Sequence, residues 1–176
     1  MIPDIRKILF ATDLTKPAHH AYDYAMSIAG RFGASITLLY VMEEPSHSYS
    51  DQLKEFLGEE RWKSVQDSHE DHARQILIGK RREATMIREA LGEFTEAARK
   101  NLEVVQSVEA EVIVTSGNVV DEILSEAKSR KADLIVMGYH VRGKLGETIL
   151  GSTTRRILRH CHIPVMMVRM PGEEEE

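Results

Sequence analysis

The sequence has a single cysteine and no long apolar run. Cys161 stands alone among 176 residues, which excludes an internal disulfide framework and fits a reducing compartment. No stretch approaches the roughly 18 consecutive apolar residues of a membrane-spanning helix. The first residues, MIPDIRKILFATD, lack the charged leader and apolar core of a secretory signal. We therefore expect a cytoplasmic protein with no membrane partner.

The chain also lacks an excess of basic residues. Lysine and arginine number 23 against 28 aspartates and glutamates, for a formal net charge of −5. General binding to nucleic-acid backbones needs a basic face, so nucleic acid is not expected as a partner. The chain ends in four glutamates, and residues 171–176 are predicted to form a solubilising acidic tail.

Several catalytic and metal-binding motifs are missing as well. Neither the serine elbow GxSxG nor the Walker motif GxxxxGK[ST] occurs, and HExxH is absent. His69 and His72 share a possible helix face, but two imidazoles alone rarely define a metal site. Cys161 lies in a mixed polar turn between two histidines, without an evident catalytic partner. We predict no catalytic residue and no metal site.

Apolar runs alternate with amphipathic stretches at both ends of the chain. Stripes of apolar residues at spacings of three and four predict helices between the runs. Such alternation implies an α/β fold with the strands covered on both faces. We expect an open, mostly parallel five-stranded sheet with helices on both faces. The predicted strands cover residues 5–11, 35–43, 111–117, 134–137 and 164–169.

The middle segment, residues 44–108, is too long for one crossover helix. A first stripe of helical spacing includes Leu53, Phe56 and Leu57, and a longer one comprises Ile87, Leu91, Phe94, Ala98 and Leu102. We predict two or more helices with a break near Gly79, forming an enlarged helical segment between strands two and three. This segment is expected to project from the sheet or to add to an oligomer contact. Residues 1–170 are expected to form a single domain.

Candidate ligand-binding groups follow the predicted strands. In an open parallel sheet, ligands bind outside the carboxyl ends of the strands, where the strand order switches. Asp13 follows the first strand, Val41 ends the second and Gly138 ends the fourth. A helix beginning near Ser152 can direct free N–H groups and a positive dipole end at an anion, and Arg142 adds charge in the preceding loop. The pattern fits either an anion site or tight turns, with Ser152 as phosphate donor or helix cap.

The chain resembles the universal stress protein family along most of its length. The segments that carry the resemblance are KILFATDLT, SITLLYVME, VTSGNVVDEIL, ADLIVMGYH and LGSTTRRILRHCHIPVMMVR, in that order. The family signature is a glycine, two residues, a glycine, nine residues, then glycine and serine or threonine. Gly138, Gly151 and Ser152 match three of its positions, and Val141 stands in place of the second glycine.

This resemblance implies a Rossmann-like fold of the adenine nucleotide alpha hydrolase type that binds ATP, with magnesium as a possible companion. Asp13 and the backbone near Val41 would hold adenine and ribose, and Gly138, Gly151 and Ser152 would hold phosphates. The full set of nucleotide-binding positions implied by the resemblance is Ala11, Thr12, Asp13, Val41, Met137, Gly138, His140, Val141, Arg142, Gly143, Gly151, Ser152, Thr153 and Thr154.

Val141 leaves more than one function open. Valine is strongly disfavoured at positive φ, and its methyl groups would approach a phosphate where glycine leaves space. The predicted function is a regulatory ATP-binding module that acts in stress response through a homodimer. The alternatives are a nucleotide-free dimeric interaction protein and a weak ATP-hydrolysing enzyme. Hydrolysis would need a positioned base; Asp13 and Glu147 are the acidic candidates, and the sequence pattern identifies no supporting residue for either.

The last predicted strand begins at Pro164 and ends at Arg169 and is apolar, so it is expected to leave an exposed sheet edge. Exposed apolar edges invite pairing with another chain. The resemblance implies that the last strands of two subunits pair, which would involve Val165, Met166, Met167 and Val168. We expect a homodimer and, in addition, a protein partner whose identity the sequence leaves open.

Overall fold

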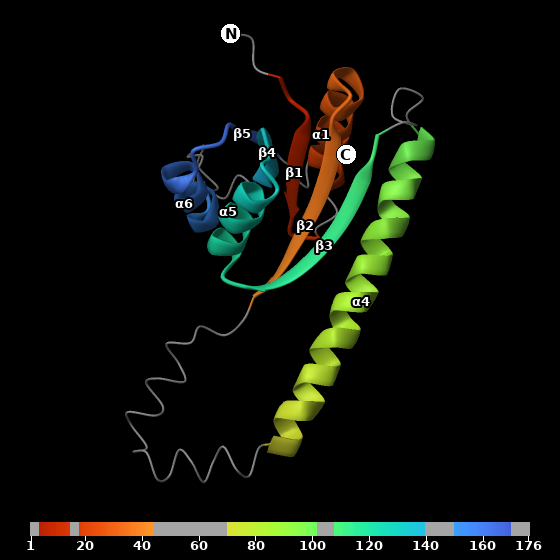
Figure 1. The fold of residues 1–176 in the computed structure, drawn as a ribbon, viewed down its shortest axis with the longest axis vertical. Coiled ribbons are helices and arrows are strands. Elements are labelled where there is room, and N and C mark those ends of the chain that lie inside the picture. The colour runs from red at the N-terminus through yellow and green to blue at the C-terminus, as the bar shows by residue number, and fades with distance from the viewer. Residues whose placement is uncertain (1–3, 15–17, 44–69, 102–107, 140–149, 170–176) are drawn as a thin grey trace, which may run out of the picture.

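A computed structural model describes residues 4–14, 18–43, 70–101, 108–139 and 150–169 (Figure 1). Strands and helices alternate in these ranges, as the apolar runs predict. In chain order the elements are β1 (Lys7–Thr12), α1 (Ala18–Phe32), β2 (Ser35–Glu43), α4 (Glu70–Asn101), β3 (Ala110–Gly117), α5 (Val119–Ser129), β4 (Leu134–Tyr139), α6 (Ser152–His160) and β5 (Val165–Arg169).

The strands form one five-stranded sheet in the order β3-β2-β1-β4-β5. All four neighbouring pairs are parallel. The chain first runs outward from β1 through β2 to β3, then crosses back to place β4 on the other side of β1. The prediction of an open parallel sheet is therefore confirmed, and the switch in strand order falls between β1 and β4.

Helices cover both faces of the sheet. Figure 1 shows α1 and α4 on one side and α5 and α6 on the other. Side chains alternate between the faces of a strand, so Phe10 packs in the core under α1 while its neighbour Leu9 packs in the core under α5. Both side chains are almost fully buried. Burial on both faces explains why each inner strand appears in the sequence as a continuous apolar run.

Helix α4 connects β2 to β3 and is longer than any strand. Its 32 residues run without interruption through Gly79, so the predicted break near Gly79 is wrong. Glycine inside a helix costs only about 1 kcal/mol relative to alanine, and a long helix anchored at one end tolerates it. The earlier predicted stripe with Leu53, Phe56 and Leu57 lies outside the described residues.

The C-terminal half of α4 belongs to the core. Leu91 and Thr95 are buried, and the ring of Phe94 lies 4.9 Å from that of Tyr22 and 4.2 Å from that of His19 on α1. The Thr95 hydroxyl donates to the Leu91 carbonyl at 2.9 Å and accepts from the Tyr22 hydroxyl at 3.4 Å. The core under α1 is therefore the surface against which the predicted stripe of this half of the helix packs.

The N-terminal half of α4 extends past the sheet (Figure 1). At 1.5 Å per residue the helix is about 48 Å long, whereas a nine-residue strand spans about 30 Å. The two faces of α4 also differ, because Met86 is 69% exposed, whereas its neighbour Ile87 packs against the core and Leu91 is only 6% exposed. Within the described ranges, no helix has an apolar stretch long enough to cross a membrane.

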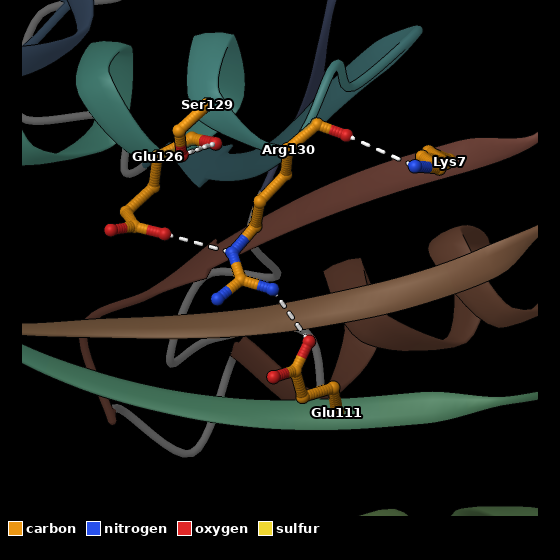
Figure 2. Close-up of polar contacts among 5 residues, drawn as sticks. All are labelled: Lys7, Glu111, Glu126, Ser129 and Arg130. Atoms are coloured by element: carbon orange, nitrogen blue, oxygen red, sulfur yellow. Dashed lines mark hydrogen bonds and ion pairs between the residues drawn. The ribbon is translucent and has the colours of Figure 1, made fainter.

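A polar cluster ties the elements together at the amino ends of the strands (Figure 2). Arg130, at the end of α5, pairs with Glu126 at 2.8 Å and with Glu111 of β3 at 2.6 Å. The hydrogen bond to Glu126 raises the pKa of Arg130 above its ordinary value. Lys7 donates its Nζ to the Arg130 carbonyl and its backbone N–H to Asp133. These contacts stabilise the edge opposite the carboxyl ends of the strands.

Candidate functional site

A cavity of about 460 Å³ lies at the carboxyl ends of β1, β2 and β4. The first turns of α1, α5 and α6 complete its walls. This is the crevice where an open α/β sheet binds ligands, next to the switch in strand order. The described lining consists of Ala11, Thr12, Asp13, Ala18, Leu39, Tyr40, Val41, Glu43, Val119, Ile123, Met137, Gly138, Tyr139, Gly151, Ser152, Thr153 and Thr154.

One wall of the cavity is apolar. Leu39 and Val41 of β2 and Met137 of β4 point to the same face of the sheet, where Val119 and Ile123 of α5 pack on them. These side chains come from two strands and a helix that together form a core, so the wall is held rigidly. An apolar wall of this kind suits a flat, weakly polar ring system.

The N-terminus of α6 forms another part of the cavity lining. Gly151 is the N-cap residue, with φ −55° and ψ 156°, and no side chain of the described residues caps the helix. Ser152 is the first helical residue, so the alternative in which Ser152 caps the helix is wrong. The first N–H groups of a helix lack intrahelical acceptors and carry the positive end of its dipole. They can therefore receive an anion that enters the cavity.

Neither backbone conformation nor packing requires glycine at position 151. Its φ of −55° is open to any residue, and a Cβ atom at this position would have no described atom within 4 Å. The space in front of Gly151 is part of the cavity. A side chain would thus cost the fold little and would occupy room that a ligand can use.

A strained turn follows β1 at the rim of the cavity. Leu14 has φ 62°, a left-handed conformation that bulky residues rarely adopt. Its N–H donates to the Thr12 hydroxyl at 3.2 Å, which fixes the turn around Asp13. Leu14 is 43% exposed, so core packing does not explain the conformation. Strained backbone of this kind concentrates at ligand sites.

Ten of the fourteen predicted site residues line this cavity. Their segments are far apart in the sequence, and the parallel sheet brings them to one edge. The ten are Ala11, Thr12, Asp13, Val41, Met137, Gly138, Gly151, Ser152, Thr153 and Thr154. The other four predicted residues, His140, Val141, Arg142 and Gly143, lie outside the described residues.

Sequence reasoning missed several lining residues. Leu39 and Glu43 lie two positions on either side of Val41, so the period of a strand places all three on one face. The two-residue period of the strand could therefore have predicted both Leu39 and Glu43 as lining residues. Val119 and Ile123 begin the helix after β3, and only the packing of α5 over the switch point brings them to the cavity. Tyr139 directly follows Gly138 and also lines it.

The fold and the cavity define the class of doubly wound α/β proteins that bind ligands at the carboxyl edge of a parallel sheet. Within that class, the chain belongs to the universal stress protein family, whose family model matches residues 4–169. The universal stress protein MJ0531 of Methanocaldococcus jannaschii is 26% identical over 172 residues, which cover 96% of this chain and 85% of that protein.

Solved structures of the same family share the fold. A universal stress protein in complex with cAMP has a TM-score of 0.59 at 17% identity, with 96% of this chain and 99% of that chain covered. A family member from Arabidopsis thaliana with AMP bound has a TM-score of 0.54 at 16% identity, and the match covers 97% of this chain and 95% of that chain. At these identities the likeness shows the fold.

Proposed function

We propose that this protein is a regulatory module that binds an adenine nucleotide, ATP, and acts in stress response as a cytoplasmic homodimer. The observation that carries the proposal is the composition of the cavity. A rigid apolar wall and a helix N-terminus that no described side chain caps face one space of about 460 Å³ at the switch point of the sheet. That space lies within the usual range for small-molecule sites, about 300–1,000 Å³.

The two parts of the cavity match the two parts of a nucleotide. The adenine ring would lie against Leu39, Val41 and Met137, where burial of a flat apolar surface is favourable. The phosphates would accept hydrogen bonds from the N–H groups at the start of α6, beside Gly151 and Ser152. Family members of the same fold are described with cAMP and with AMP bound, which supports an adenine nucleotide as the ligand.

The proposed role is binding rather than catalysis. Asp13 and Glu43 provide the carboxylates of the described lining, and these could share a magnesium ion with bound phosphates. Hydrolysis would also need a nucleophile oriented by a base, and the proposal assigns neither role to a residue of the described lining. Val141, in place of the second signature glycine, favours the nucleotide-free interaction protein as the alternative function.

A mass spectrum of small molecules released from the purified protein tests the proposal. We expect an adenine nucleotide in near-stoichiometric amount, because the ligand would be enclosed between sheet and helices. The protein should be purified without added nucleotide and denatured immediately before the measurement. A spectrum without any nucleotide, from protein that also fails to take up ATP when it is added, would favour the interaction protein.

The homodimer is proposed from the outer edge of β5. This strand is last in the sheet order, so one of its sides has no neighbouring strand in the described part of the chain. The Pro164 carbonyl accepts from the Ile135 N–H of β4, so residues 164, 166 and 168 direct their backbone groups inward. The N–H groups of Val165 and Met167 then point outward, and their side chains are only half-buried. An apolar edge of this kind invites pairing with a second copy.

Met167→Pro should shift the protein from dimer to monomer. Proline removes an N–H that points away from β4, so the intramolecular ladder keeps its hydrogen bonds, and edge strands tolerate proline. Sedimentation at micromolar concentration should show a dimer for the wild type and a 20.0 kDa species for the variant. A wild type that sediments as a monomer would contradict the proposed dimer, and so would a variant that stays dimeric.

A further inference from the structure

A second hollow, of about 180 Å³, lies on the exposed side of α6. Ser152, Arg155, Arg156 and Arg159 line it. The three arginines follow Ser152 by three, four and seven residues, so all four side chains lie on one face of the helix. Ser152 also lines the cavity at the switch point, so the two hollows meet at the first residue of α6.

The three arginines of this face are not neutralised by the described part of the chain. None of them takes part in an ion pair there, whereas Arg130 pairs with both Glu111 and Glu126. Like charges three or four residues apart destabilise a helix by a few tenths of a kcal/mol per pair. The protein as a whole is acidic, with a net charge of −5. A local concentration of positive charge in an acidic protein indicates an anionic ligand at this face.

Two of these arginines stand about one turn from the mouth of the cavity, which Ser152 lines and the arginines do not. Cα–Cβ bonds tilt toward the N-terminus of a helix, so a side chain covers the turn that precedes its own Cα. Arg155 and Arg156 therefore reach back toward Ser152. The described lining of the cavity itself carries Asp13 and Glu43 and no basic side chain. Among the described residues, α6 therefore supplies the positive charge nearest to a highly charged ligand, and Arg142 of the preceding loop lies outside them.

We infer that Arg155 and Arg156 form the binding arm for the terminal phosphates of a nucleoside triphosphate. This inference rests on the proposed function, because it assigns part of the same ligand. The guanidinium group donates paired hydrogen bonds that match phosphate oxygens. A monophosphate or cyclic nucleotide ends near Ser152 and does not reach the arm. The site thus distinguishes nucleotides by the number of their phosphates. Arg159 lies one turn farther along the same face of α6 and is not part of the arm.

Titration of ATP and AMP, each with magnesium at about 0.15 M salt, near physiological ionic strength, tests the inference on the full chain. In the double variant Arg155→Gln/Arg156→Gln, ATP should bind at least tenfold more weakly, while AMP affinity changes less than twofold. The matched control is Arg31→Gln/Arg82→Gln, which removes the same charge from two exposed positions on α1 and α4. This control should leave both affinities unchanged. Circular dichroism should show that both variants are folded.

The outcomes separate the inference from the proposed function. If the wild type binds AMP and ATP and the double variant weakens both equally, the arm does not exist but the nucleotide site does. If the control variant loses as much ATP affinity as the double variant, the change in net charge alone explains the loss. That result would also overturn the inference. If the wild type binds neither nucleotide, the proposed function fails, and the inference fails with it.

Discussion

Replacing Gly151 by valine is expected to abolish nucleotide binding while the protein stays folded. The Cβ and methyl groups would extend into the cavity at the point where phosphates approach the start of α6. Affinity should fall at least a hundredfold, which corresponds to about 2.7 kcal/mol. Position 151 has φ −55°, and a Cβ atom there would have no described atom within 4 Å. The cost to stability is therefore limited to the poor capping of valine, about 1 kcal/mol.

Gly151→Ser is the matched control, because serine is a good N-cap residue. Its hydroxyl can cap α6, so the free energy of unfolding should stay the same or rise, while its Cβ still enters the ligand space. We expect opposite changes in stability and affinity, measured by thermal melts and calorimetric titration. ATP affinity within threefold of the wild type in Gly151→Val would show that the nucleotide does not approach this end of α6.

Leu91→Ala should destabilise the protein by about 2–5 kcal/mol, the usual cost of truncating a buried leucine. Leu91 is 6% exposed and packs in the core that α4 shares with α1. Met86 lies five residues earlier on the same helix and is 69% exposed. Met86→Ala should change the free energy of unfolding by less than about 0.5 kcal/mol, as surface substitutions do.

Urea denaturation of both variants would distinguish the core-facing side of α4 from its exposed side. Equal, small effects would mean that α4 does not belong to the core, and its contacts with Tyr22 and His19 would then be incidental. Equal, large effects would mean that the face that carries Met86 is covered in solution. A large difference would show that α4 packs one face on the core and leaves the other exposed.

Apolar periodicity was sufficient to predict the sheet and most of the helices. The inner strands are buried on both faces, so their apolar runs are continuous. Gly33 follows the last residue of α1 and has a φ of 64°, the positive value that a C-cap glycine favours. Lys131 adopts a similar φ of 56° just after α5, which its residue type does not indicate. The break predicted at Gly79 failed because one glycine is too small a penalty to interrupt a helix anchored by Leu91 and Ala98.

The candidate site was predictable where it depends on strand ends. Asp13, Val41 and Gly138 follow or end predicted parallel strands, and topology alone brings them to one edge. The apolar contribution of Val119 and Ile123 depends on how α5 packs across the sheet, which no local pattern specifies. Whether Gly151 or Ser152 caps α6 could not be predicted, because the two alternatives differ by one residue in where the helix begins. Sequence patterns do not define helix ends to within one residue.

Calorimetric titration of the wild type and of Val141→Gly with ATP and magnesium tests the central claim most directly. We predict that the wild type binds one nucleotide per chain. Val141→Gly should bind more tightly, because glycine restores the family signature and lacks the two methyl groups of valine. A tenfold gain would correspond to about 1.4 kcal/mol. The absence of binding heat in both proteins would contradict the claim and would identify the protein as a nucleotide-free interaction module of the same fold.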